Sequence, residues 1–192
     1  MKIIDPFILA SSSPRRKRLL KEAGFNFSAI ESNIKESLDL RFPPEAMAEH
    51  WAREKAISVS QKYPNKLVIG ADTIINLKGK ILGKPKDKND SFKMLKMLSG
   101  KTHEVITGIS FIRSSNNLDI TYNEISYISL RILSDKEINF YINNYNTLDK
   151  AGSYGIQSFF SIHVLNIKGC FYNIMGLPLS SLYTRLKSIQ KK

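Results

Sequence analysis

The chain has 192 residues, of which 42% are hydrophobic and 24% are charged, so it is long enough to bury a core and short enough to form one domain. This composition excludes a disordered or collagen-like chain. A single cysteine, Cys170, excludes an intramolecular disulfide and a cysteine-based zinc site, and it is typical of a reducing compartment.

No apolar stretch approaches the roughly 20 residues needed to cross a bilayer, and Asp5-Pro6 interrupts the apolar start before a signal-peptide core forms. We therefore expect a cytoplasmic protein with no membrane partner. The net charge of +12 indicates either a polyanion-binding surface or a lysine-rich composition without functional meaning. The lysines are scattered and no run of five basic residues occurs, which favours the second explanation.

The first third of the chain alternates predicted strands and helices. Strands are expected over 3–10 and 25–30. Between them, a run of serines followed by Pro14 is typical of a capped helix start, and Gly24 ends that helix. A longer helix is expected over 45–63, where apolar residues recur at spacings of three and four.

The remaining sequence predicts hairpins and three further helices. A short strand over 67–69 is expected to end before a hairpin over 73–82, and alternating segments over 104–112 and 118–133 predict two long antiparallel strands. The other expected elements are a strand around 163–167 and helices over 87–98, from a capping box at Ser134 to about Asn144, and over 179–189. The fold class is therefore α/β with a partly antiparallel sheet.

The segment from Ser11 to Arg16 places three serines, a proline and two arginines at the start of the first helix. Unpaired N–H groups and the helix dipole attract anions there, so Arg15 and Arg16 stand where positive charge is unfavourable. A bound phosphate chain would supply the missing negative charge and accept hydrogen bonds from the arginines and hydroxyls. The alternative is a solvated basic first turn, which costs roughly a few tenths of a kcal/mol.

Three charged residues stand beside predicted apolar elements. Lys55 falls on the apolar side of the helix over 45–63, where a buried ammonium needs an anionic partner unless its stem reaches water. Asp72 follows an apolar strand just before the hairpin, a common place for catalytic and metal-binding carboxylates, although a turn-forming role explains it as well. Lys84 closes that hairpin and either returns toward Asp72 or is an exposed loop charge.

A glycine-spaced loop runs from Asp149 to Gln157. Its glycines permit a ligand to approach the backbone, and the Gln157 amide has the groups to bond a base edge, a phosphate or a metal-bound water. The three histidines lack metal-ligand spacing. The sequence also contains no Walker phosphate loop, Rossmann glycine fingerprint or serine-hydrolase elbow. Taken one at a time, these patterns identify no reaction.

Taken in order, the motifs resemble those of the Maf family of nucleoside triphosphate pyrophosphatases over nearly the whole chain. The matching segments are Leu9–Arg16, Arg53–Ala56, Gly70–Thr73, Ile81–Pro85, Leu98–Gly100, Thr107-Gly108, Asp149–Gly152, Tyr154–Gln157 and Gly176–Pro178. Their order and spacing make the resemblance specific, whereas each segment alone would not.

The resemblance implies a single Maf-like domain over 1–192 with a two-lobed α/β fold, a mixed sheet and a central cleft, similar to inosine triphosphate pyrophosphatases. It also implies a homodimer that uses Mg²⁺ or Mn²⁺ to hydrolyse a nucleoside triphosphate to monophosphate and pyrophosphate. The Pro-Arg-Arg, Ala-Asp-Thr and Gly-Ile-Gln variants resemble the subgroup that acts on dTTP, UTP and modified pyrimidine nucleotides. The other main subgroup acts on 7-methyl-GTP.

The resemblance also implies roles for individual residues. Asp72 matches the family's essential aspartate, which binds the metal or activates the attacking water. Glu36 matches an acidic residue that helps to hold the metal, with Glu31 and Asp39 as nearby alternatives, and Gln157 would help to hold metal and water. Binding and neutralising the triphosphate would involve Ser11, Ser13, Arg15, Arg16, Lys55, Thr73 and Lys84.

The chain departs from the family pattern at Ser158, where glycine is usual, and at Cys170-Phe171, where Asp-Tyr is common. Neither change removes a proposed catalytic group. Two other interpretations remain open at this point. A nucleic-acid-binding regulator would use the basic surface, but no helix-turn-helix or stacking-aromatic motif supports it. An inactive interaction protein in cell-division control is opposed by the retention of the charged motifs.

Overall fold

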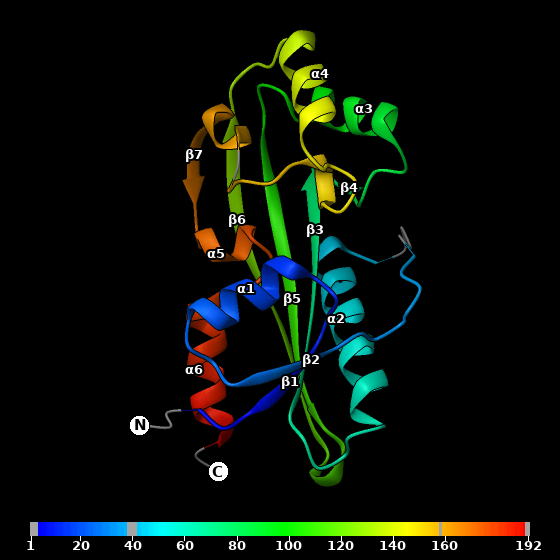
Figure 1. Ribbon diagram of the computed structural model, residues 1–192, viewed down its shortest axis with the longest axis vertical. Coiled ribbons are helices and arrows are strands. Elements are labelled where there is room, and N and C mark those ends of the chain that lie inside the picture. Colours follow the sequence, from blue (N-terminus) through cyan, green and yellow to red (C-terminus); the bar gives the residue numbers. More distant parts are fainter. Residues whose placement is uncertain (1–3, 38–41, 158, 191–192) are drawn as a thin grey trace.

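A mixed sheet of seven strands forms the centre of the described part of the protein, residues 4–37, 42–157 and 159–190 of a computed structural model (Figure 1). The strand order is β2-β1-β3-β5-β6-β7, and β4 pairs with β3 outside this path. The elements in chain order are β1 (Phe7–Ala10), α1 (Pro14–Glu22), β2 (Phe27–Ile30), α2 (Pro44–Ser60), β3 (Val68–Leu77), β4 (Lys80–Leu82), α3 (Lys88–Leu98), β5 (Thr102–Arg113), β6 (Leu118–Leu130), α4 (Asp135–Asn144), β7 (Val164–Lys168), α5 (Phe171–Ile174) and α6 (Leu179–Gln190).

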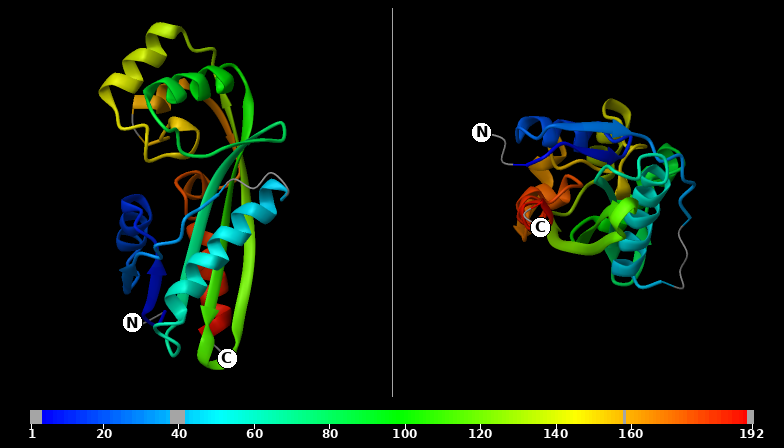
Figure 2. Two further views of the ribbon diagram at one scale, coloured as in Figure 1. Left: turned by 90° about the vertical axis from the view of Figure 1, so that its right-hand side faces the viewer. Right: turned by 90° about the horizontal axis from the view of Figure 1, so that it is seen from below.

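The long strands β3, β5 and β6 run antiparallel through both lobes of the molecule and join them (Figures 1 and 2). In the lower lobe, β1 and β2 add parallel strands to the sheet, and helices α1, α2 and α6 surround it. In the upper lobe, β4 and β7 flank the long strands, and α3 and α4 cover them. Within the described residues, no helix is both long and apolar enough to span a membrane.

Alternation along β3 divides the core between the two faces of the sheet. Ile69 and Ile75 point into the largest cluster, which includes side chains of α1 and α6, whereas Ile74 packs in a separate cluster with Met47 and Ala48 of α2. The two faces of this strand are therefore both covered in the folded protein.

Helix α2 lies close to the sheet because two glycines face it. A Cβ atom at Gly70 would stand 2.0 Å from the carbonyl oxygen of Ala52, and one at Gly108 would stand 2.2 Å from that of Ala48. Both alanines are fully buried. Small residues on both surfaces thus bring the backbone of α2 directly onto β3 and β5, and side chains along its inner face can reach the middle of the sheet.

The predicted secondary structure is confirmed with shifts at element ends, except in β3. Helix α1 begins at Pro14, and α4 begins at a capping box formed by Ser134. The predicted break between 69 and 73 is wrong, because β3 continues through Asp72 and pairs with β5 on both sides of it. The strand tolerates this charge because the carboxylate meets the Lys55 ammonium of α2.

We expect Gly70→Ala to reduce the free energy of unfolding by about 3 kcal/mol or more, because the added methyl group meets the rigid backbone of α2. Urea unfolding followed by circular dichroism measures this change. A midpoint equal to that of the wild-type protein would show that α2 and β3 do not pack as closely as described.

An aromatic cluster in the upper lobe surrounds Tyr154. Its ring stacks on Phe160 at 4.6 Å between centroids, and its hydroxyl oxygen lies 2.6 Å from Nε2 of His103 on β5. Burial lowers the pKa of His103 to about 4, and its Nδ1 has no hydrogen-bond partner among the described residues. The imidazole is therefore neutral at pH 7 in the folded protein.

This depressed pKa predicts a loss of stability in mild acid. Between pH 6.5 and about 4, His103 binds a proton in the unfolded chain but not in the folded protein, so the free energy of unfolding falls as pH drops through that window. The contribution of this residue is about 2 to 3 kcal/mol between pH 7 and pH 4.5. His103→Gln, which keeps a polar partner for Tyr154, should show a smaller loss in urea unfolding. Equal losses in both proteins would contradict the assignment.

Candidate active site

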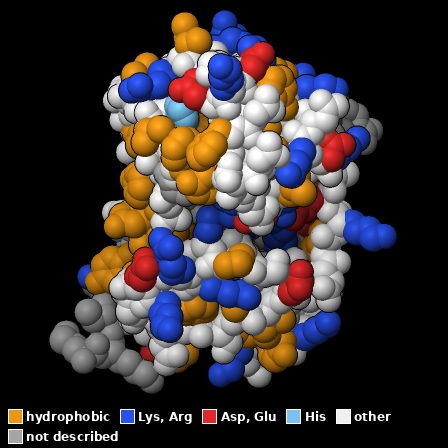
Figure 3. Space-filling model, turned by 45° about the horizontal axis from the view of Figure 1, so that its top comes forward, with side chains coloured by type: hydrophobic (Ala, Val, Ile, Leu, Met, Phe, Trp, Pro, Cys, Tyr) orange, Lys and Arg blue, Asp and Glu red, His pale blue; other side chains and the backbone are white. Residues whose placement is uncertain are grey.

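A gap in the pairing of β3 opens a cleft between the lobes. β1 pairs with Val68–Gly70, and β4 pairs with Ile75–Leu77. Among the described residues, 71–74 therefore have a strand partner only on the β5 side. A cavity of about 590 Å³ lies at this gap, and Figure 3 shows basic and acidic side chains gathered in the hollow between the lobes. This volume is in the range of small-ligand sites.

The cleft brings together every described residue to which the sequence assigned a role. Its lining includes Ser11, Ser13, Arg15, Arg16, Glu31, Glu36, Lys55, Asp72, Thr73, Lys84 and Gln157. Asp39 and Ser158 lie outside the described residues. These side chains come from α1, α2, β3 and four loops that are distant in the sequence, so the fold collects charged groups that no local spacing predicts.

Lys55 is buried between two carboxylates. Its Nζ lies 2.7 Å from Oδ1 of Asp72 and 2.6 Å from Oε1 of Glu36. The Lys55 and Asp72 side chains are only 9% and 8% exposed, whereas Glu36 is 39% exposed. One ammonium is shared by two carboxylates, so this group carries an excess negative charge that faces the cleft. The alternative that the Lys55 stem extends to place its ammonium in water is therefore wrong.

Arg16 is a buried cation whose described contacts are all neutral. Its guanidinium donates to the carbonyl oxygen of Gly176 at 2.8 Å, to Oγ1 of Thr73 at 2.9 Å and to Oγ of Ser11 at 3.3 Å. Burial lowers the pKa of Arg16, and the nearby Asp72 opposes that shift. Ser13 accepts the Arg16 backbone N–H as the N-cap of α1. A buried guanidinium without a carboxylate contact in the described chain favours a bound anion.

Arg15 has a partner that the sequence interpretation missed. Its Nη1 lies 2.7 Å from Oδ2 of Asp149, and its Nη2 donates to the Asp149 carbonyl oxygen at 3.1 Å. Asp149 also accepts from Lys150 at 2.6 Å. Burial alone would raise the pKa of Asp149, but Lys150 and Arg15 together lower it. The sequence did point to Asp149, because this residue begins one of the segments that match the Maf family, but no role was assigned to it.

The described lining contains five basic side chains, Arg15, Arg16, Lys55, Lys84 and Lys150, and four carboxylates, Glu31, Glu36, Asp72 and Asp149. The cleft thus has an excess of one positive charge, far below the roughly four negative charges of a triphosphate. A divalent cation would supply part of the positive charge that the lining lacks. Mg²⁺ is commonly held by one or two carboxylates together with substrate phosphates, and the pair of Asp72 and Glu36 offers such ligands. The described residues contain no cluster of three metal-ligating side chains.

Comparison with known proteins identifies relatives of nearly equal length. The chain is 43% identical over 186 residues to a dTTP/UTP pyrophosphatase of Ruminiclostridium cellulolyticum, covering 96% of both chains. It is 43% identical over 185 residues to a protein of the same name from Fusobacterium nucleatum, again covering 96% of both. A Bacillus anthracis protein of that name is 42% identical over 180 residues, covering 94% of this chain and 93% of the relative.

The fold is also found in a solved structure. The Staphylococcus aureus Ham1 protein superposes with a TM-score of 0.50 at 15% identity, covering 96% of this chain and 99% of that one. The expected α/β fold with two lobes and a mixed sheet is therefore confirmed. A family model described as Maf-like protein matches residues 6–189, and together with the relatives it shows that this chain belongs to the Maf family.

Proposed function

We propose that this protein hydrolyses dTTP and UTP to the nucleoside monophosphate and pyrophosphate. The proposal rests on the charged groups of the cleft. The buried Arg16 cation has no carboxylate contact among the described residues, and near it Lys55 binds the two carboxylates of Asp72 and Glu36. Relatives at 41–43% identity carry the name dTTP/UTP pyrophosphatase. The comparisons give no support to a nucleic-acid-binding or cell-division regulatory function.

The phosphate tail would bind at the start of α1. There, Arg16 presents a fixed guanidinium, and Ser11 and Ser13 add hydroxyl groups. In the first helical turn, Pro14 has no N–H and Ser13 caps that of Arg16, so the backbone N–H of Arg15 is the one that can bind an anion. Arg15 keeps N–H donors beyond the two that bind Asp149. Lys84, exposed at the other end of the β3 gap, adds a positive charge. Thr73 orients Arg16 through its hydroxyl.

Asp72 and Glu36 would hold a divalent cation, Mg²⁺ or Mn²⁺. When bound, such an ion neutralises phosphate charge and lowers the pKa of a coordinated water. Asp72 is fixed by β3 and by the Lys55 ammonium at 2.7 Å, so its second oxygen can accept the proton of a water that attacks the α-phosphorus. Gln157 at the cleft wall would orient that water by its amide. Pyrophosphate is then the leaving group.

A homodimer in the cytoplasm is also proposed. The cytoplasm holds the nucleoside triphosphates that the proposed reaction consumes. Support for a second copy comes from large apolar side chains on the surface, since Ile132 is 83% exposed, Leu165 63% and Ile162 54%. Exposed apolar groups of this size are typical of protein interfaces when they are contiguous.

A substrate panel tests the proposed reaction. We expect pyrophosphate release from dTTP and UTP in the presence of Mg²⁺, with much slower release from purine nucleotides. Asp72→Asn keeps the shape of the side chain but removes its charge, so it should reduce kcat by about 1,000-fold while the protein remains folded. Coupled detection of pyrophosphate measures both. Equal or zero turnover of all eight common nucleoside triphosphates would refute the function.

Metal removal tests whether Asp72 and Glu36 hold a divalent cation together. Dialysis against a chelator should abolish turnover, and Mg²⁺ or Mn²⁺ should restore it. Glu36→Gln should raise the half-saturating metal concentration about tenfold, because one of two carboxylate ligands is lost. Titration of activity against free metal measures this shift. Full activity in the presence of the chelator would exclude a metal-dependent reaction.

A further inference from the structure

The segment that carries Glu36 is held to the protein by side chains of α2. This acidic loop, residues 31–37, follows β2 and contains no helix or strand. No backbone-to-backbone hydrogen bond links it to another described residue. Its described attachments are instead contacts from one helix, so the position of the Glu36 carboxylate depends on that helix rather than on a sheet.

Trp51, Lys55 and Ser58 lie on one face of α2 at spacings of four and three. The Nε1 of Trp51 donates to the carbonyl oxygen of Ser37 at 2.9 Å, and Lys55 binds Glu36 at 2.6 Å. Ser58 lies 3.2 Å from the carbonyl oxygen of Ser32, but its single hydroxyl proton is shared with the carbonyl oxygen of Lys55 at 3.2 Å. The loop thus runs antiparallel to α2. It is anchored near its start at Ser32 and at its end through Glu36 and Ser37.

Trp51 is the stronger of the two hydrogen-bonding anchors. Its side chain packs against the cluster that contains Met47 and Ala48, and it makes an edge contact with His50 at 4.8 Å between ring centroids. The indole is therefore fixed, and its N–H holds Ser37, the residue directly after Glu36. An ion pair with one partner as exposed as Glu36 contributes little alone, and the Trp51 hydrogen bond is exposed as well, so the two contacts together place the carboxylate.

We infer that Trp51 is a positioning residue that fixes Glu36 for the metal and water of the hydrolysis, through the Ser37 carbonyl. This inference rests on the proposed function and adds to it a residue for which neither the sequence motifs nor the resemblance assigned a role. Trp51 also lines the cleft, and it is the single tryptophan of the chain, so its fluorescence reports on the site.

The test is Trp51→Phe, which keeps an aromatic ring in the cluster and removes the N–H donor. We expect kcat to fall about fivefold, the effect of one hydrogen bond, and the half-saturating Mg²⁺ concentration to rise by a similar factor. KM for dTTP at saturating metal should change by less than about twofold. Tyr63→Phe, an exposed aromatic beyond the end of α2, is the matched control and should retain wild-type values.

A double-mutant cycle separates positioning from a general structural role. In the Glu36→Gln background, Trp51→Phe should cause no further loss, because the group that it positions is already absent. Ser58→Ala removes the weaker anchor, which holds Ser32, four residues before Glu36. It should lower kcat by less than about twofold. A Trp51→Phe loss of the same size in both backgrounds, or an unchanged kcat and metal dependence, would overturn the inference.

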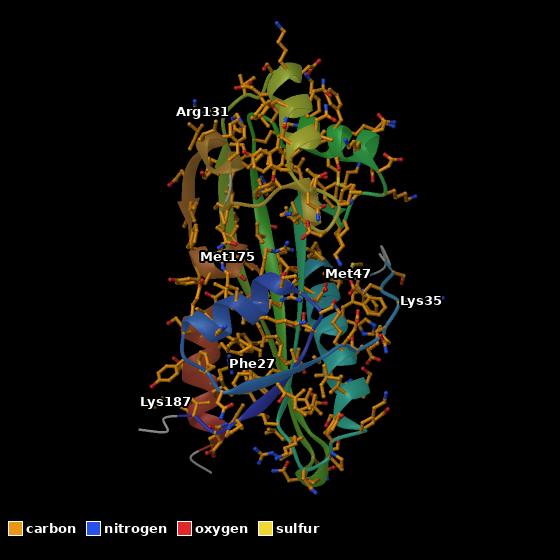
Figure 4. The ribbon with its side chains drawn as sticks, viewed as in Figure 1. Phe27, Lys35, Met47, Arg131, Met175 and Lys187 are labelled. Atoms are coloured by element: carbon orange, nitrogen blue, oxygen red, sulfur yellow. The ribbon has the colours of Figure 1, made fainter. Side chains whose placement is uncertain are left out.

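Limited proteolysis tests the Trp51 anchor without measuring hydrolysis, so its outcome does not depend on the proposed function. Lys35 lies on the exposed side of the acidic loop (Figure 4), so trypsin can cleave the Lys35–Glu36 bond when the loop detaches. Mass spectrometry should show cleavage about fivefold faster in Trp51→Phe and unchanged in Tyr63→Phe. If the wild-type protein hydrolyses no nucleotide, the proposed function fails, while faster cleavage still supports the anchor. Unchanged cleavage refutes the anchor whatever the activity.

Discussion

The Lys55 ammonium, buried between Asp72 and Glu36, is the interaction on which the organisation of the site depends. It joins three segments, since the lysine belongs to α2, the aspartate to the centre of β3 and the glutamate to a loop. Taking such charges out of water costs several kcal/mol per ion, and loss of one partner leaves the others uncompensated. The arrangement is therefore retained at a cost in stability, which is understandable where the carboxylates must be held at a cleft.

Close packing of α2 makes that interaction geometrically accessible. Without a Cβ atom at Gly70, the helix backbone approaches β3, and Lys55 reaches Asp72 at 2.7 Å. The same approach places the adjacent turns of α2 along the acidic loop. One helix thus serves the core through its alanines and the site through its polar face, so that substitutions in the packing surface also disturb the chemistry.

The sequence permitted prediction of most elements, because caps and periodicity are local signals, whereas the residues that meet in the cleft were expected from the resemblance of the ordered motifs to the Maf family. The continuity of β3 was not predictable in this way, since Asp72 in an apolar run is typical of a strand end and only its long-range partner explains it. The Arg15–Asp149 contact joins residues 134 positions apart. The Trp51–Ser37 contact likewise depends on how a loop without regular structure lies on a helix.

The cleft exists because β1 stops at Ala10, where a tight turn from the Ser11 N–H to the Leu9 carbonyl leads the chain into α1. One or two more paired residues on β1 would run along the open edge of β3 and seal the opening with backbone. The length of this four-residue strand therefore limits how much of the β3 edge is covered, and it leaves the segment from Ala10 to Arg16 to line the opening.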